Sequence, residues 1–176
     1  LALWVLGFPR VSNVTSRLLA QGRPLNSHPD TVEDYAEARL DLQTGAVVRL
    51  ACSWKLPAGC DAQISGSFYG TKAGARFHNI GGSFYEFTAE HLLGTHRQVL
   101  SAGQEEWGGR AVVDWARRLG SGLRFDPEVE NLGQVASVLD AIYREGGLER
   151  GRPRAGADQN RPELRESGAP TLVVNL

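Results

Sequence analysis

Residues 34–54 read DYAEARLDLQTGAVVRLACSW and predict two antiparallel strands joined by a tight turn. Apolar and polar residues alternate strictly in the first strand, which is typical of a strand with one buried and one solvated face. The turn is 43–45, because Gly45 can adopt the positive φ that a three-residue hairpin loop needs. Pairing Leu42 with Ala46 aligns the apolar rows of the two strands and places Arg39 opposite Arg49, so the pattern also predicts the register.

Further strands are expected on both sides of this hairpin. Alternation returns at 61–69, and the glycines of 70–74 then predict a second hairpin turn. The β-branched residues of 11–19 make that stretch a candidate strand, and 84–88 is predicted to be another. The start of the chain, Leu1 to Gly7, is typical of the last turns of a helix closed by a glycine. We therefore expect a fragment whose N-terminus lies upstream.

Two amphipathic helices are predicted in the second half of the chain. Apolar residues recur every four positions from Trp107 to Leu119, which indicates one helix. Asp126 followed by Pro127 is a typical start for the other, whose predicted apolar stripe runs to Ile142. Strands in the middle and helices towards the ends indicate an α+β fold, a mainly antiparallel open sheet with helices packed on one face. The stripe of the second helix consists of Leu132, Val135, Ala136, Leu139 and Ile142.

The composition changes near Gly147. Residues 1–146 have the content of one folded domain, whereas 151–170 are rich in Arg, Gly, Pro and acidic residues and poor in apolar ones. We expect 147–176 to be a disordered tail that is dispensable for folding. The closing 171–174 stays open: it can add a strand to a sheet edge or hang loose.

Several classes of function are disfavoured. A formal net charge of −1 argues against a nucleic-acid binder, which needs a basic surplus. There is no apolar run of membrane-spanning length and no signal peptide, so we expect a cytoplasmic protein. His91 and His96 lack the spacing of helical metal ligands, and no metal site is predicted. No glycine-rich strand-to-helix turn occurs, so no cofactor-binding residues are predicted in this chain.

Trp54 and Lys55 are the first candidate ligand contacts, because an aromatic residue and a cation end a core strand beside a Pro-Gly loop. The alternative for Trp54 is simple core packing, which its place in the apolar row favours. Arg110, in the first turn of the 107–119 helix, is a further candidate, and a solvated arginine is its alternative. Cys52 lies in the apolar row and is expected to be a small buried residue, although a bridge to Cys60 stays open.

Several short motifs follow one another along the chain: LWVLG at 3–7, VED at 32–34, TGA at 44–46, SW at 53–54, YGTKAG at 69–74 and AIY at 141–143. In this order they resemble the C-terminal domain of the glucose–fructose oxidoreductase/inositol dehydrogenase (Gfo/Idh/MocA) family. The resemblance covers about residues 1–145. It implies an N-terminal Rossmann domain that binds NAD or NADP outside this chain, and a domain here that helps to bind substrate and forms oligomers.

The resemblance also bears on the site residues. The family's catalytic lysine and histidine lie before this domain, so it implies no catalytic residue in this chain and no activity of the chain alone. Aromatic residues at the end of the family's matching strand approach a polyol, which supports Trp54 and Lys55. The implied function is the substrate-binding and oligomerisation part of an NAD(P)-dependent oxidoreductase acting on a sugar, cyclitol or related hydroxy compound. The alternative is a free-standing, non-catalytic binding or oligomerisation module.

The polar row of the opening hairpin is the predicted oligomer face. A row that mixes both signs of charge is complementary to its own image across a two-fold axis. Since the resemblance implies oligomers formed through the sheet, we expect a homodimer, with a solvated face and a monomer as the alternative. This face consists of Tyr35, Glu37, Arg39, Asp41 and Arg49.

Overall fold

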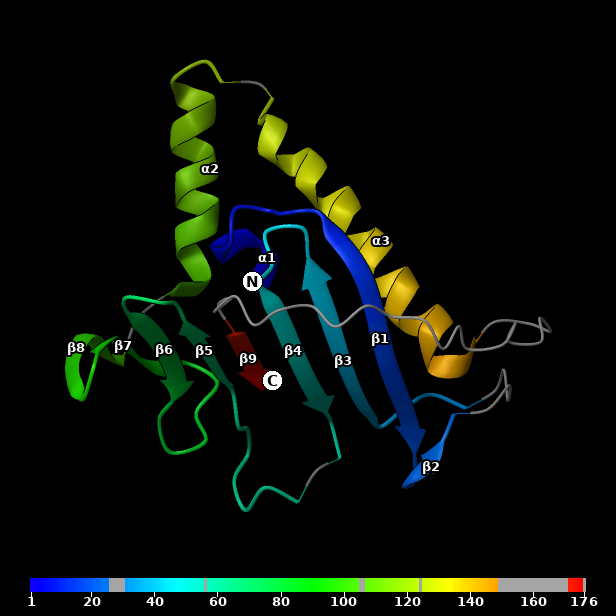
Figure 1. Ribbon diagram of the computed structural model, residues 1–176. Coiled ribbons are helices and arrows are strands. Elements are labelled where there is room, and N and C mark those ends of the chain that lie inside the picture. Colours follow the sequence, from blue (N-terminus) through cyan, green and yellow to red (C-terminus); the bar gives the residue numbers. More distant parts are fainter. Residues whose placement is uncertain (26–30, 56, 105–106, 124, 149–170, 176) are drawn as a thin grey trace.

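The structure, a computed structural model, describes residues 1–25, 31–55, 57–104, 107–123, 125–148 and 171–175. One open sheet carries a short helix and a long helix on one face, and a further helix stands beside it (Figure 1). The helices are α1 Ala2–Val5, α2 Arg110–Gly120 and α3 Asn131–Tyr143, with short turns η1 Trp107–Gly109, η2 Pro127–Glu130 and η3 Arg144–Leu148. The strands are β1 Val11–Ala20, β2 Arg23–Pro24, β3 Tyr35–Leu42, β4 Val47–Ser53, β5 Ser65–Tyr69, β6 Gly74–Asn79, β7 Glu86–Leu93, β8 His96–Gln104 and β9 Thr171–Asn175.

The strand order is β2-β1-β3-β4-β9-β5-β6-β7-β8. Two antiparallel groups, β2-β1-β3-β4 and β5-β6-β7-β8, are joined by the last strand, which runs parallel to β4 and antiparallel to β5. The predicted α+β class with a mainly antiparallel open sheet is confirmed.

The predicted hairpin has the predicted register. Leu40 pairs with Val48 and Arg39 with Arg49. At the turn, the Gly45 amide donates to the Leu42 carbonyl at 2.9 Å, and Gly45 has a φ of 85°. This conformation strains residues with a Cβ, so the glycine is needed there. Alternation of side chains along the strands is therefore sufficient to fix this pairing.

The core lies between the first strand group and the helices α1 and α3. Leu18, Leu40 and Val48 are its largest fully enclosed side chains, and Val138 and Ile142 cover them from α3. Just past α3, a Cβ on Gly146 would lie 2.5 Å from Leu18 Cγ. Glycine thus lets the end of the helix approach β1 closely.

The apolar stripe of α3 differs from the prediction. Val138 and Ile142 are buried and Val135 is half-buried, whereas Leu132 is 61% and Leu139 50% exposed. The helix meets the sheet mainly along β1, so only a narrow strip of its surface is covered. The remaining apolar residues form a second stripe along its flank.

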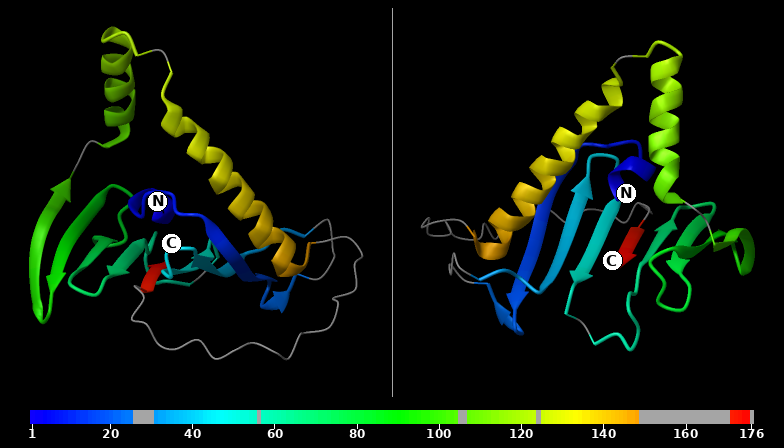
Figure 2. Two further views of the ribbon diagram at one scale, coloured as in Figure 1. Left: turned by 45° about the horizontal axis from the view of Figure 1, so that its top comes forward. Right: turned by 180° about the vertical axis from the view of Figure 1, so that it is seen from behind.

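The packing prediction for the 107–119 helix is wrong. It forms η1 and α2 as a helix, but α2 buries no side chain. Figure 2 shows α2 rising away from the sheet. It follows β8, the outermost strand, so it begins where the sheet ends. Strand β8 itself was not predicted, because 96–104 lacks regular alternation.

Strand β9 bears on the predicted tail. Most of 147–176 lies outside the described residues, but Thr171–Asn175 pairs with β4 and β5 in the middle of the sheet. The expectation of disorder does not hold for these five residues. They form a strand, one of the two alternatives left open for 171–174, but the strand lies inside the sheet and not at its edge. Among the helices described, none is both long and apolar enough to cross a membrane.

Candidate functional site

A cavity of about 510 Å³ opens where β3 begins and β4 ends. Tyr35 and Ser53 are paired at this end of the sheet, and residues of the connection from β4 to β5 also line the cavity. Antiparallel pairing brings the start of one strand to the end of the next, which places these side chains together. The lining residues are Tyr35, Ala51, Cys52, Ser53, Trp54, Ala58, Cys60, Asp61, Ala62, Gln63, Ile64 and Phe84.

Trp54 lines this cavity and is 68% exposed. The alternative of core packing does not hold for Trp54, because β4 ends at Ser53 and the next residue lies beyond the sheet. Its indole Nε1 donates to the Glu33 carbonyl at 2.8 Å. This hydrogen bond fixes the ring in place while its surface stays open to a ligand.

Lys55 lies against Trp54 rather than in the cavity. Its Nζ is 4.9 Å from the centroid of the indole ring, within the range of a cation–π contact. Its side chain is not among those that line the cavity. Lys55 therefore supports the ring and adds a positive charge beside it.

Arg110 lies apart from these two residues. It is the first residue of α2, and α2 begins at the opposite end of the sheet from the end of β4 (Figure 1). The structure brings Trp54 and Lys55 together but does not bring Arg110 to them.

Both cysteines line the cavity as free, exposed thiols. The expectation that Cys52 is buried is wrong, since it lies near the end of β4 where no helix covers the sheet. No bridge to Cys60 is formed. Within the described residues, no group of three or more histidine, cysteine and acidic side chains is arranged to hold a metal ion.

The lining suits a small polyhydroxylated molecule. Tyr35, Trp54 and Phe84 offer ring faces, while Asp61 and Gln63 offer hydrogen-bond donors and acceptors. Ligand sites commonly combine such apolar walls with a few polar groups that fix orientation. Phe84 was not recognised from the sequence, since only the fold brings the connection before β7 to the end of β4.

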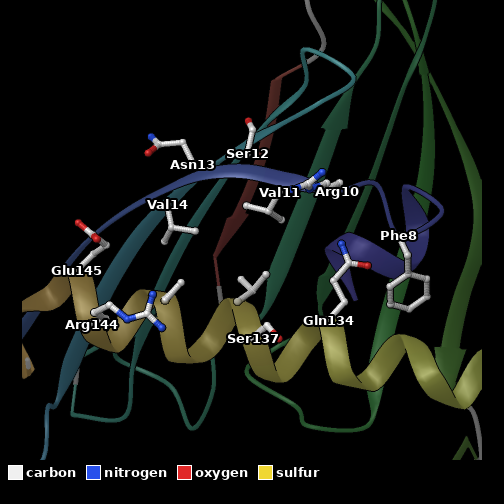
Figure 3. Close-up of a pocket in the computed structure, with 12 residues that line it drawn as sticks. Phe8, Arg10, Val11, Ser12, Asn13, Val14, Gln134, Ser137, Arg144 and Glu145 are labelled. Carbon is white, nitrogen blue, oxygen red and sulfur yellow. The ribbon is translucent and has the colours of Figure 1, made fainter.

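A second cavity, of about 560 Å³, lies between β1 and α3 (Figure 3). Val14 points from the strand towards the helix and Gln134 from the helix towards the strand, whereas Ser12 and Asn13 point away. The Gln134 amide donates to the Pro9 carbonyl at 2.8 Å, which ties the two walls together. None of the residues predicted to bind a ligand lies here, and Phe8 is its one aromatic ring. The cavity beside Trp54 is therefore the stronger candidate.

The predicted oligomer face lies on the side of the sheet away from α3. Arg39 donates to Asp41 Oδ1 through Nε and Nη2, each at 2.9 Å, and Asn13 donates to Asp41 Oδ2 at 3.1 Å. Glu37 and Arg49 are exposed beside them. Tyr35, at the end of this row, also lines the cavity.

Comparison with known proteins places the fold. No family model matches the sequence, and no curated protein matches it. A solved structure does match. The fold resembles that of a sugar-nucleotide dehydrogenase. That solved structure is the UDP-N-acetylglucosamine 3-dehydrogenase GnnA from Acidithiobacillus ferrooxidans, and this chain matches it with a TM-score of 0.51 and 14% sequence identity.

The match covers 84% of this chain and 44% of the dehydrogenase. The chain thus spans less than half the length of that enzyme. GnnA is a Gfo/Idh/MocA enzyme, so the fold agrees with the family that the sequence motifs resemble. At this level of identity the likeness concerns the fold.

Proposed function

We propose that this chain is the substrate-binding and oligomerisation part of an NAD(P)-dependent oxidoreductase acting on a sugar, cyclitol or related hydroxy compound. The observation that carries the proposal is the cavity at the end of β4, where the fixed indole of Trp54 stands beside Asp61 and Gln63. The same type of fold occurs in a dehydrogenase whose name gives UDP-N-acetylglucosamine as its substrate. In this proposal the ring of the hydroxy compound stacks on Trp54, and its hydroxyl groups bond to the polar lining.

Binding of hydroxy compounds to the purified chain tests the site. Saturation-transfer NMR against a panel of hexoses, inositols and UDP-N-acetylglucosamine identifies a ligand, and titration gives its Kd. We expect Trp54→Ala to weaken binding about tenfold, the loss expected when an aromatic contact of about 1.4 kcal/mol is removed. Trp4→Ala is the matched control, because Trp4 is equally exposed but lies on α1. Equal affinities of the two variants would contradict the proposed site.

The cofactor belongs to the part of the protein outside this chain. A pyrophosphate is received by a glycine-rich turn from a strand into a helix, and the sequence contains no G-x-G-x-x-G motif. We therefore expect no binding of NADH or NADPH to this chain in calorimetric titration. Saturable binding at micromolar cofactor would place the cofactor site here instead.

The oligomer face is proposed to form a homodimer through the polar side of β3 and β4. Across a two-fold axis, a face carrying Glu37 and Asp41 as well as Arg39 and Arg49 meets opposite charges on its image. Arg39→Glu replaces a favourable contact with a repulsive one and also breaks the bond to Asp41. Dissociation of the dimer by this variant, measured by sedimentation velocity, is the expected result.

A further inference from the structure

Two consecutive residues before β3 hold the end of β4. The Glu33 carbonyl accepts from Trp54 Nε1 at 2.8 Å, and the Asp34 carbonyl accepts from the Ser53 hydroxyl at 2.7 Å. Both donors belong to residues that line the candidate cavity. The 33–34 segment therefore fixes two neighbouring side chains in the wall of that cavity.

Both carboxylates of the 33–34 segment are bound by other parts of the fold. The Glu33 carboxylate accepts from the hydroxyl of Tyr143, the last residue of α3. The Asp34 carboxylate accepts at 2.9 Å from the backbone amide of Gln21, just after β1. The Asp34 amide donates to the Leu19 carbonyl of β1, also at 2.9 Å. The segment is thus held from two sides, by α3 at Glu33 and by the end of β1 at Asp34.

The indole of Trp54 depends on such bonds because burial does not hold it. The residue is 68% exposed and follows the last residue of β4. An exposed side chain changes rotamer rapidly unless a specific contact restrains it. The Nζ of Lys55 lies 4.9 Å from the indole centroid, but Lys55 is exposed as well. The hydrogen bond to Glu33 is therefore the contact that ties the ring to the rest of the fold.

Three of the short motifs of the sequence meet at this point. VED at 32–34, SW at 53–54 and AIY at 141–143 lie far apart in the sequence, and each supplies one residue of the bonds from Tyr143 through Glu33 to Trp54. Tyr143 also lies close to the cavity wall. The bond to Glu33 is the main cause of its raised pKa, and Cys52, which lines the cavity, contributes to it.

We propose that Tyr143 is a positioning residue for the candidate site. Its bond to the Glu33 carboxylate keeps the Glu33 carbonyl where it accepts from Trp54, and the indole is thereby held in the orientation that receives the ligand. Tyr143 is not among the residues that line the cavity, so its removal disturbs the indole without removing a ligand contact. The role of the indole in binding rests on the proposed function, whereas the tie from Tyr143 to the indole rests on the geometry.

NMR signals of isotope-labelled tryptophan report the state of the indole directly. The chain has four tryptophans, and Trp54→Phe identifies the indole signal of Trp54 in a heteronuclear correlation spectrum. We expect Tyr143→Phe to shift this signal and to speed the exchange of its proton with water. The signals of the other tryptophans should stay in place, which shows that the variant is folded.

Affinity is measured in the same variants. The probe is whichever of the hexoses, inositols and UDP-N-acetylglucosamine binds the wild type most tightly. We expect Tyr143→Phe to weaken its binding roughly fivefold, the effect of losing the net contribution of one hydrogen bond. Tyr69→Phe, on β5, is the matched control and should keep both the wild-type spectrum and the wild-type Kd.

Variants of Glu33 separate positioning from a general loss of structure. Glu33→Gln keeps a side-chain oxygen that accepts from Tyr143, so it should retain the wild-type signal and affinity. Glu33→Ala should reproduce the effects of Tyr143→Phe. The double variant should lose no more than either single variant, because both changes remove the same bond.

The failures of the two proposals look different in this experiment. An unmoved Trp54 signal in Tyr143→Phe would overturn the positioning role, and so would a shifted signal with wild-type affinity. An equal shift in Tyr69→Phe would overturn it as well. A shifted signal in a protein that binds none of the probes supports the tie between Tyr143 and Trp54 and contradicts the proposed function instead.

Discussion

At the scale of single residues, Tyr143 connects α3 to the edge of the candidate site. Its hydroxyl donates to the Glu33 carboxylate, and the Glu33 carbonyl accepts from Trp54. One residue thus links the last turn of the helix to the indole that lines the cavity. The hydrogen bond to Glu33 raises the pKa of Tyr143 above its ordinary value of 10.0, with burial and the Glu33 charge acting in the same direction.

The raised pKa of Tyr143 predicts a loss of stability at alkaline pH. The folded state favours the neutral phenol, so its contribution is full below about pH 10 and declines as the pH rises through the raised pKa. We expect urea denaturation to show a fall in stability above that pH that is smaller in Tyr143→Phe. Tyr69→Phe, at another exposed tyrosine, should keep the wild-type slope. The same slope in all three proteins would contradict the assignment.

The residue pattern predicted on which face of the sheet a side chain lies, but not whether that side chain is buried. The alternation of apolar side chains placed Leu40 and Val48 correctly in the core. The same alternation extended to Cys52 and Trp54 failed, because α3 lies along β1 and leaves the end of β4 uncovered. Alternation reports which side of a sheet a residue lies on, whereas cover depends on elements distant in the sequence.

At the scale of elements, the start of the second predicted helix follows the sequence closely. Asp126 caps η2 and Pro127 occupies its first turn, as the pattern predicted. We expect Asp126→Ala to lower the free energy of unfolding by about 1 kcal/mol, since the orphan amide of Glu128 loses its acceptor.

A second variant separates the cap from the ion pair. Asp126→Asn retains the capping oxygen and removes the charge that faces Arg118. Because exposed ion pairs contribute little, this variant should lie close to the wild type in chemical denaturation. A loss as large as that of Asp126→Ala would assign the effect to the ion pair instead.

Helix α2 shows that hydrophobic periodicity predicts a helix but not what its apolar face packs against. The four-residue spacing of Trp107, Ala111, Trp115 and Leu119 correctly predicted a helix with an apolar face. It did not predict what covers that face, because amphipathicity is the same whether the cover is a sheet, another helix or another chain. The apolar stripe predicted for α3 was also partly wrong. It left out Val138, which lies in the core, and included Leu132, which is exposed.

At the scale of the whole molecule, β9 joins the two antiparallel groups of strands into one sheet. Its backbone pairs with β4 on one side and β5 on the other. We expect Val173→Pro to lower the Tm markedly, because proline removes a ladder donor and is tolerated only at sheet edges. An unchanged Tm in Val173→Pro would restore the original prediction that this end of the chain is dispensable.

The position of β9 in the sheet could not be predicted from the sequence. The segment is a short apolar run after a long polar one, and such a run is compatible with any edge or with none. Its position follows from the gap between two groups of strands, each of which is formed by antiparallel pairing within the group. Local patterns therefore predicted the two halves, and their junction depends on a contact across most of the chain.

That junction also sets an order of events during folding. Val47 pairs with Thr171, so the centre of the sheet cannot close until residues 171–175 have left the ribosome. Hairpins form within about microseconds, and both halves can therefore exist while their inner edges, β4 and β5, are still unpaired. Exposed strand edges pair readily with other chains. During synthesis, the time between completion of β5 and arrival of β9 is thus the period in which this protein is most exposed to aggregation.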